Sequence, residues 1–351
     1  MASKVLYAGI LLWSSNGGIS LLMGKKITII GGSGFVGTNL CSALEKSRVD
    51  FEILDLKKSN KFSDKTKISD IRNIDSLREN VTGDVVINLA AVHRDDIQDL
   101  SEYTRTNIDG AANLAKICSE KGICKIIFTS SVAVYGFTTK PTGEDGQINP
   151  FNEYGRSKFA AEEVFRSWGQ KAGRQLFIIR PTVIFGAGNR GNVYNLLNQI
   201  ASRKFLMIGH GKNHKSLAYI DNVVAFLQAC IQSDQTDALY NYVDGPDMTM
   251  DELVKYIRLK LFGTSTVGLR IPRWLGMLIG HIADALSNLF LKKLTISAIR
   301  IKKFTSSSHF ISSKSELAGF SPPYTLIEGL NRTIKSEFTS PNPDREVFFT
   351  E

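Results

Sequence analysis

Cysteine is scarce in this 351-residue chain, and none of it is spaced for a metal site or a disulfide framework. The four cysteines form no CxxC pair, and each lies in an apolar or helical pattern. This excludes a disulfide-stapled secreted domain and a cysteine-bound zinc site as the basis of the fold. We therefore expect a cytoplasmic protein whose length is sufficient to bury a hydrophobic core without covalent cross-links.

Acidic residues are missing from most of one basic stretch. The chain has 43 Lys and Arg against 34 Asp and Glu, a formal net charge of +9, yet Asp284 is the single acidic residue between 255 and 303. The basic residues there are Lys255, Arg258, Lys260, Arg270, Arg273, Lys292, Lys293, Arg300, Lys302 and Lys303. No nucleic-acid module accompanies them. An anionic phospholipid or a diphosphate ligand is favoured over nucleic acid, with a solvated basic face as the alternative.

Long hydrophobic runs are also missing. The apolar run 5–13 is too short to span a bilayer. We expect residues 1–24 to be a leader outside the fold, with a weak membrane anchor as the alternative.

Residues 274–286 are strongly apolar, but His281 and Asp284 argue against a transmembrane span. This stretch fits a helix that lies in a membrane interface, in which case the protein would sit at the inner face of the cell membrane, or a helix that lines an apolar ligand groove. The alternative is a helix that simply packs on the substrate lobe.

Glycine, by contrast, is concentrated where a tight turn needs it. Residues 27–30 form a short apolar pattern typical of a buried strand, and a helical pattern then runs to Leu44. Glycines at 31, 34 and 37 let a pyrophosphate approach the backbone and let the helix pack on the sheet. The amides at the start of the helix then face the phosphates. The cofactor residues expected in this turn are Gly31, Ser33, Gly34, Phe35, Val36 and Gly37.

Further cofactor contacts are expected at the ends of the next strands. Asp55 closes the strand 51–55, at the distance where a carboxylate accepts hydrogen bonds from the adenosine ribose. It disfavours a 2′-phosphate, so NAD is expected rather than NADP. Ala90 and Ala91 end the strand 85–89, and their small side chains suit close approach of the cofactor or, equally, tight helix packing.

Strand and helix patterns alternate along the first half of the chain. A helix at 107–119 separates the strand 85–89 from a strand at 125–129, and another strand follows at 175–180. This order predicts an α/β fold, a doubly wound parallel sheet of the Rossmann-like type with a smaller C-terminal substrate lobe. We expect an NAD-binding domain at 25–180, a lobe at 181–340 with strands returning to the sheet, and a tail at 341–351.

A tyrosine and a lysine four residues apart supply the candidate chemistry. Tyr154 and Lys158 share one face of a predicted helix, so the ammonium can favour the phenolate. Tyr154 is therefore a candidate base. Ser131 lies just beyond the carboxyl end of the strand 125–129, where it could hydrogen-bond the same substrate oxygen.

Together these landmarks resemble the extended short-chain dehydrogenase/reductase superfamily over about residues 26–335. The positions that carry the resemblance are Gly31, Gly34, Gly37, Asp55, Asp70, Ile71, Ala90, Ala91, Asn107, Ser131, Tyr154, Lys158, Arg180 and Pro181. The resemblance implies that Asp70 and Ile71 flank the adenine and that Lys158 also binds the nicotinamide ribose. It further implies a homodimer formed through helices near 107–119 and 155–168.

Within that superfamily the chain is similar to the sugar 4-epimerases rather than the 4,6-dehydratases. Dehydratases carry an acidic pair directly after the residue that matches Ser131, whereas Val132 and Ala133 stand here. Residues 91–96, 129–136, 180–197 and 240–244 resemble the bacterial epimerases that act on N-acetylglucosaminyl-diphospho-undecaprenol in O-antigen assembly. The resemblance implies substrate contacts at Ser131, His93, Asn192, His214, Lys215 and Ser308, with His214 in place of an arginine that faces the diphosphate in 4-epimerases.

The expected activity is therefore an NAD-dependent inversion of C4 of N-acetylglucosamine to N-acetylgalactosamine on a diphospho-undecaprenol carrier. Tyr154 would take the proton from O4 while C4 gives a hydride to bound NAD, and the 4-keto sugar would turn over before it is reduced again. No metal is needed. Three alternatives remain: a soluble UDP-N-acetylglucosamine 4-epimerase, a membrane-associated hydroxysteroid-type dehydrogenase that consumes NAD, and a non-catalytic NAD-binding regulator.

Overall fold

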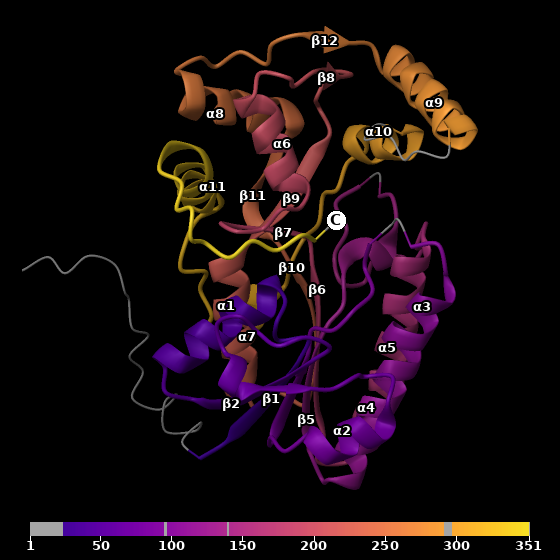
Figure 1. Ribbon diagram of the computed structural model, residues 1–351, viewed down its shortest axis with the longest axis vertical. Coiled ribbons are helices and arrows are strands. Elements are labelled where there is room, and N and C mark those ends of the chain that lie inside the picture. The colour runs from indigo at the N-terminus through magenta and orange to yellow at the C-terminus, as the bar shows by residue number, and fades with distance from the viewer. Residues whose placement is uncertain (1–23, 95–96, 139, 291–296, 351) are drawn as a thin grey trace, which may run out of the picture.

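The computed structural model describes residues 24–94, 97–138, 140–290 and 297–350. The expected leader, apart from residue 24, lies outside the described residues, as do the basic residues Lys292 and Lys293. Figure 1 shows a sheet with helices on both faces and a smaller lobe above it. Within the described ranges, no helix is long and apolar enough to cross a membrane.

The central sheet has seven strands, all parallel, in the order β10-β6-β5-β4-β1-β2-β3. Its strands are β1 (Lys26–Ile30), β2 (Asp50–Asp55), β3 (Thr66–Ile68), β4 (Val85–Asn88), β5 (Lys125–Thr129), β6 (Gln175–Pro181) and β10 (Asp237–Tyr242). The predicted α/β fold with a doubly wound parallel sheet is confirmed. β10 comes from beyond residue 181 and pairs with β6 at the edge of the sheet.

Each face of the sheet has its own hydrophobic core. On one face α1 (Phe35–Lys46) and α7 (Ile220–Gln232) pack over Ile27 and Ile29. On the other face α2 (Ile74–Asn80), α4 (Gly110–Glu120) and α5 (Glu153–Gly169) cover Ile30 and Ile126. Successive side chains of a strand point to opposite faces, so neighbours such as Ile29 and Ile30 enter different cores.

Several short helical turns lie between or beside the longer elements. α3 (Ser101–Tyr103) runs through a π-helical turn, η3 (Thr104–Asp109), into α4, so the helix predicted at 107–119 begins earlier and is irregular at its start. The other short turns are η2 (Ser63–Lys65), η4 (Val132–Tyr135), η5 (Lys314–Glu316) and η6 (Lys335–Thr339). After η5 the chain passes the prolines at 322 and 323 before its last α-helix begins at Leu326.

The smaller lobe is built on two short sheets. One has the order β11-β9-β7, and the other pairs β12 with β8. Their strands are β7 (Val183–Phe185), β8 (Met207–Ile208), β9 (His214–Tyr219), β11 (Asp244–Thr249) and β12 (Arg270–Ile271). The helices are α6 (Asn192–Ala201), α8 (Met250–Phe262), α9 (Arg273–Phe290), α10 (Ala298–Thr305) and α11 (Leu326–Ile334). In Figure 1, α9 forms the outer rim of this lobe, far from the central sheet.

Candidate active site

The glycine-rich turn between β1 and α1 forms a cradle of the kind that binds a pyrophosphate. Gly31 has φ +77°, and a Cβ there would lie 2.7 Å from the backbone nitrogen of Ala90. A Cβ at Gly37 would lie 2.5 Å from Cα of Gly32, so the helix packs directly on the turn. A Cβ at Gly34 would meet only one backbone oxygen, at 3.5 Å. Backbone is therefore packed tightly behind the turn while its ligand side stays open, which fits the cofactor expected there.

The carboxylate of Asp55 lies beside this turn. Oδ2 of Asp55 accepts a hydrogen bond from the backbone N–H of Ser33 (3.0 Å), and Oδ1 accepts one from Lys57 (3.3 Å). The Ser33 hydroxyl in turn donates to the carbonyl of Lys57 (2.9 Å). Phe35 begins α1 and is buried, and Val36 is partly buried against the same core. The expected ribose and phosphate contacts therefore lie next to one another.

The residues expected to flank the adenine lie on the next loop. Asp70 forms an ion pair with Arg72 (2.7 Å), whose guanidinium also contacts Glu102 (3.1 Å). Hydrogen bonds from Arg72 lower the pKa of the Asp70 carboxyl. Ile71 is buried and packs against Gly110 at the start of α4. Asp70 therefore stays ionised and able to accept hydrogen bonds.

The turn η4, which Ser131 caps, packs on the start of α5, the helix that carries Tyr154 and Lys158. The Asn152 side chain caps α5 by accepting from the N–H of Gly155 (3.0 Å), which places Tyr154 in the first turn of the helix. A phenolate is stabilised there by the helix dipole. Ser131 caps η4 and accepts from the backbone N–H of Ala133 (3.1 Å). A Cβ at Gly155 would lie 2.5 Å from the carbonyl oxygen of Ala133, so the two turns are in contact.

Lys158 lies one helical turn beyond Tyr154 and is buried. Its ammonium lies 4.2 Å from the centroid of the Phe128 ring. Burial lowers the pKa of Lys158 to about 7, while the nearby carboxylate of Glu162 acts in the opposite direction. While it keeps its proton, Lys158 carries a buried charge that water screens only weakly, so it can favour an anion one helical turn away.

We expect Lys158→Met to raise the free energy of unfolding below pH 7, although it removes the side chain placed beside Tyr154. The unfolded lysine keeps its proton up to about pH 10.5, whereas the folded lysine loses it near pH 7. Between these values the unfolded state holds more protons, so the stability of the native protein rises with pH. The advantage of the variant should therefore be largest below pH 7 and shrink toward pH 10.5. Urea denaturation at pH 6 and pH 9 measures it; an equal difference at both pH values contradicts the burial cost.

Asn107 links the loop after β4 to α5 immediately beside Lys158. Its side chain accepts from the N–H of Val92 (2.8 Å) and donates to the carbonyl of Val92 (2.9 Å) and the hydroxyl of Ser157 (2.8 Å). The asparagine is buried within the π-helical turn η3. It therefore fixes both Ala91, which precedes Val92, and the face of α5 that carries Lys158.

A buried ionic network lies behind the same helix, and sequence reasoning missed it. Arg180 makes a two-pronged ion pair with Glu162 (2.5 and 2.9 Å) and donates to the hydroxyl of Tyr135 (2.6 Å). Ser130 also donates to Glu162 (2.5 Å). Two features of the sequence could have indicated this network. They are the charged Arg180 within an apolar strand and Glu162, four residues after Lys158. The network holds the end of β5, and so Ser131, against α5.

Three of the expected substrate residues meet in the smaller lobe. Ser308 donates its N–H to the carbonyl of His214 (3.0 Å) and accepts from the N–H of Ser216 (2.7 Å), beside the start of β9. The ring of His214 stacks on His309 with centroids 4.7 Å apart. His214 and Ser308 are both partly exposed, as ligand contacts must be.

Lys215 is used to anchor α10. Its ammonium donates to the carbonyls of Lys303 (3.0 Å) and Ser306 (2.8 Å), at the C-terminal end of that helix. Burial lowers the pKa of Lys215 to about 8. The Asn213 side chain bonds the carbonyls of Phe304 and Ser306 as well. Lys215 therefore positions the basic helix α10 rather than presenting a free charge.

The two remaining expected substrate residues lie on other elements. His93 is exposed on the loop after β4, with Nδ1 3.3 Å from the carbonyl of Ala91. Asn192 is exposed at the first residue of α6. The structure does not bring either of them into contact with His214, Lys215 or Ser308.

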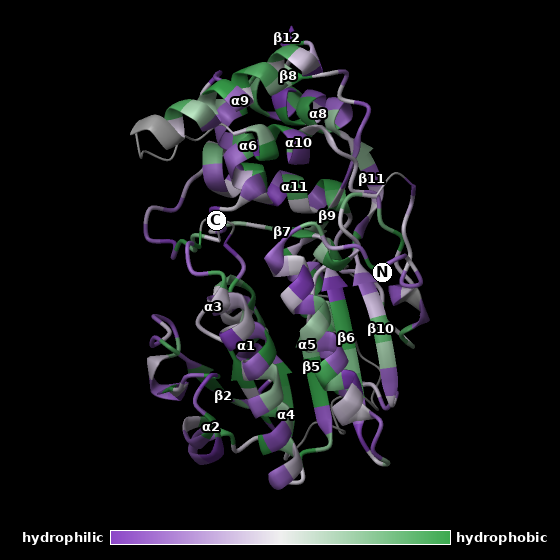
Figure 2. Cartoon of the chain, turned by 90° about the vertical axis from the view of Figure 1, so that its right-hand side faces the viewer, coloured by the Kyte–Doolittle hydropathy of each residue, from purple (hydrophilic) through white to green (hydrophobic). Residues whose placement is uncertain are grey.

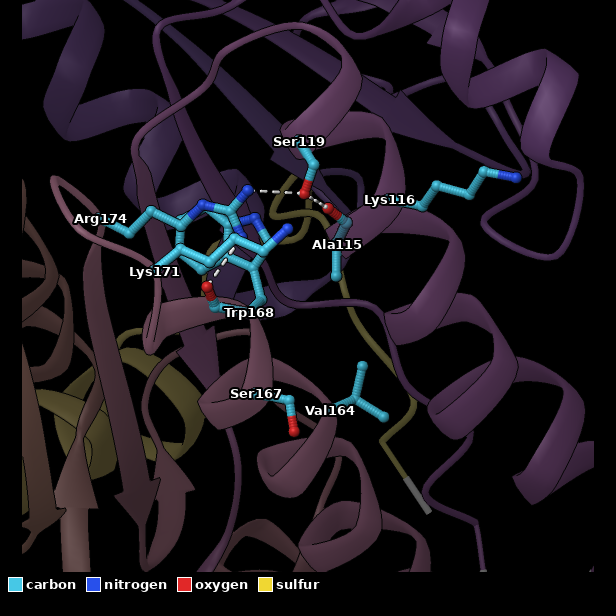
Figure 3. A pocket seen from close by; sticks show the side chains of 8 residues that line it. All are labelled: Ala115, Lys116, Ser119, Val164, Ser167, Trp168, Lys171 and Arg174. Atoms are coloured by element: carbon cyan, nitrogen blue, oxygen red, sulfur yellow. Dashed lines mark hydrogen bonds between the residues drawn. The ribbon is translucent and has the colours of Figure 1, made fainter.

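A shallow hollow on the outer face of α4 and α5 is separate from this site (Figure 3). The Arg174 guanidinium stacks on the Trp168 ring (4.6 Å) and bonds the Trp168 carbonyl (2.8 Å) and the Ser119 hydroxyl (2.9 Å). Trp168 lies near the end of α5 opposite Tyr154, about 20 Å along the helix. The hollow therefore takes no part in the candidate chemistry.

Comparison with known proteins agrees with this geometry. Residues 27–242 match the model of the NAD dependent epimerase/dehydratase family. The chain is 44% identical over 335 residues to N-acetyl-alpha-D-glucosaminyl-diphospho-ditrans,octacis-undecaprenol 4-epimerase of Escherichia coli O157:H7, covering 94% of this chain and 100% of that protein. Among solved structures it resembles UDP-N-acetylglucosamine 4-epimerase of Methanobrevibacter ruminantium M1 in complex with UDP-N-acetylmuramic acid (TM-score 0.71, 21% identity, 90% of this chain and 99% of that one). It also resembles MoeE5 in complex with UDP-glucose and NAD (TM-score 0.68, 20% identity, 90% and 99%). At these identities the solved structures bear on the fold alone.

Proposed function

Because the chain belongs to the NAD dependent epimerase/dehydratase family, we propose that it inverts C4 of N-acetylglucosamine carried on diphospho-undecaprenol, giving the N-acetylgalactosamine epimer for surface polysaccharide. The observation that carries the proposal is the 44% identity, over nearly the whole length of both chains, to the E. coli O157:H7 protein, whose name specifies this lipid-linked sugar. The cradle at 31–37 and Asp55 would hold NAD, which supplies a reversible hydride acceptor when bound.

The residues of this chain then handle the proton of the sugar. We assign Tyr154 as the base that removes the proton from O4, favoured as phenolate by the start of α5 and by the ammonium of Lys158. Ser131, oriented by the N–H of Ala133, would hydrogen-bond the same oxygen. When the 4-keto sugar has presented its other face, Tyr154 returns the proton. Net redox change is zero, so NAD need not be replaced.

The turn after β5 supports epimerisation rather than dehydration. Elimination of water from the sugar needs a carboxylic acid beside the base. The residues following Ser131 are Val132 and Ala133, in the turn η4 that touches the start of α5. Neither side chain can donate or accept a proton, so the reaction ends with the return of hydride to C4.

Basic residues near the site fit a substrate that carries a diphosphate. Lys302 and Lys303 of α10 lie 5.0 and 5.4 Å from the ring centroids of Phe137 and Phe151, respectively. These two rings stack on each other with centroids 4.4 Å apart, on the loop that leads into Tyr154. The basic end of α10, fixed by Lys215, therefore lies against the loop that leads into Tyr154, which suits a substrate with an anionic linkage.

Helix α9 presents an apolar face that fits a lipid carrier. Small residues Gly276 and Gly280 face the protein, since a Cβ at either would lie under 3 Å from Ile208 or Ala298. The residues exposed on the other side recur every four positions: Trp274 (68%), Leu278 (49%), Ile282 (52%) and Leu286 (42%). Figure 2 shows α9, with much of its ribbon coloured as hydrophobic, at the rim of the smaller lobe. With Arg270, Arg273 and Arg300 nearby in the sequence, α9 has the composition of a helix that lies in an anionic membrane interface.

We expect the double change Trp274→Ser and Leu278→Ser to weaken binding to phosphatidylglycerol vesicles at least tenfold, because it removes two of the four residues of the exposed apolar stripe, including the most exposed one, while leaving the buried face of α9 intact. Leu259→Ser, at a similarly exposed leucine (45%) on α8, is the matched control and should bind as the unchanged protein does. Co-sedimentation with vesicles measures this. Unchanged binding of the double variant would contradict membrane contact by α9 and would mean that this helix only packs on the smaller lobe.

We also propose a homodimer in which α4 and α5 of two copies pack together, as the family resemblance implies. The outer face of these helices is exposed at Ala112, Lys116, Glu163 and Ser167. Light scattering should give twice the 38.8 kDa of one chain. A monomer mass at micromolar concentration contradicts this pairing.

A further inference from the structure

The last residues of the chain form an ordered strap. From 345 to 350 the exposed and partly buried residues alternate: Glu346, Phe348 and Thr350 face inward, and their neighbours are exposed. This period of two is that of an extended chain with one face against the protein. Figure 1 shows the segment crossing the middle of the molecule, between the smaller lobe and the central sheet. We call residues 345–350 the C-terminal strap.

One side of the strap is fixed to the smaller lobe. Phe348 donates its N–H to the carbonyl of Gly188 (2.9 Å) and accepts from the N–H of Arg190 (2.8 Å). The Thr350 hydroxyl donates to the side chain of Asn189 (2.6 Å). That loop is itself held by Glu337, which accepts from the N–H of Gly188 (2.7 Å) and pairs with Arg190 (2.8 Å). The strap therefore has a rigid support.

The other side of the strap touches the cofactor cradle. The ring of Phe348 packs on the ring of Phe35, the first residue of α1, with centroids 5.7 Å apart. The Asn60 side chain donates to the carboxylate of Glu346 (2.7 Å), and Asn60 lies on the loop that follows Asp55. The strap thus connects the loop after the ribose-binding carboxylate, the start of the phosphate-binding helix and the smaller lobe.

We infer that the C-terminal strap retains NAD, with Phe348 acting as a cofactor-retaining residue. Movement of the smaller lobe or the loop at Asn60 away from the cradle first requires the strap contacts to break. A reaction without net redox change gains from keeping one NAD molecule through many turnovers. The inference rests on the NAD requirement of the proposed function but not on the identity of the sugar or its carrier.

The test compares Phe348→Ala with Phe349→Ala. Phe349 is the adjacent residue of the same type, but it is 76% exposed and faces outward. Each protein is loaded with NAD and passed repeatedly through gel filtration, and the NAD released on denaturation is measured. We expect Phe348→Ala to lose NAD about tenfold faster than the unchanged protein, the effect of removing one partly buried aromatic contact. Phe349→Ala should retain NAD normally.

A second variant keeps the inference testable if Phe348→Ala folds poorly. Asn60→Ala removes the exposed anchor of Glu346 without touching the core, and should also speed NAD loss. Thermal unfolding at saturating NAD verifies that each variant is folded. Normal retention by both folded variants would overturn the inference. Failure of the unchanged protein to bind any NAD would instead overturn the proposed function. Conversion of a UDP-linked sugar would contradict only the lipid carrier, because retention of NAD does not depend on the carrier.

Discussion

Tyr154→Phe is expected to lower the epimerisation rate about a thousandfold, within the range known for loss of a general base. Phenylalanine keeps the ring but removes the oxygen that we propose takes the proton from O4. The residue lies in the first turn of a capped helix and is only partly buried, so the fold should not depend on its hydroxyl. Single-turnover formation of the C4 epimer measures the loss. The variant should bind NAD and unfold at the same temperature as the unchanged protein.

A matched change separates this effect from the general loss of a tyrosine hydroxyl. Tyr256 on α8 donates to Asn331 (2.6 Å), in the smaller lobe and away from the cradle. Tyr256→Phe should leave turnover unchanged. Near-normal turnover by Tyr154→Phe, with full NAD occupancy, would remove Tyr154 from the catalytic role.

Arg180→Met is expected to cost about 3–5 kcal/mol of unfolding free energy, the usual result of breaking one side of a buried ion pair. Glu162 is fully buried, and Arg180 supplies two of its hydrogen bonds as well as its counter-charge. Without the guanidinium, Glu162 must either stay charged in a buried site that has lost its main counter-charge or take up a proton. Urea denaturation, analysed for both midpoint and slope, measures the loss.

An exposed ion pair on the same helix provides the control. Arg156 pairs with Glu153 in the first turn of α5, and both side chains are exposed. Arg156→Met should give no measurable change in stability, because water compensates for the missing partner. Equal effects of the two arginine changes would show that Glu162 is not held by Arg180.

The sequence predicted the cofactor half of the molecule well because its signals are local. β5 was predicted with the observed bounds, and the glycine turn, Asp55 and the Tyr154 helix lie where their neighbours in the sequence indicated. Each depends on a strand pattern, a tight turn or a helical spacing of four residues. Such features are set by residues within one element.

The parts that could not be predicted depend on contacts between distant residues. Phe348 meets Phe35 across more than 300 positions, so a sequence pattern gave only a tail at 341–351. Lys215 was predicted to contact the substrate, but its ammonium is bonded to carbonyls about 90 residues away, at the end of α10. The roles of His93, Asn192, His214 and Ser308 stay predictions, since their ligand is a molecule that no internal contact can reveal.

The most direct test of the whole account offers the purified protein two substrates in parallel, N-acetylglucosaminyl-diphospho-undecaprenol and UDP-N-acetylglucosamine, without added NAD. We predict that the C4 epimer forms from the lipid-linked sugar and not from the UDP sugar, with no accumulation of reduced cofactor. Conversion of the UDP sugar alone would contradict the lipid carrier and leave the exposed face of α9 without a role in substrate binding.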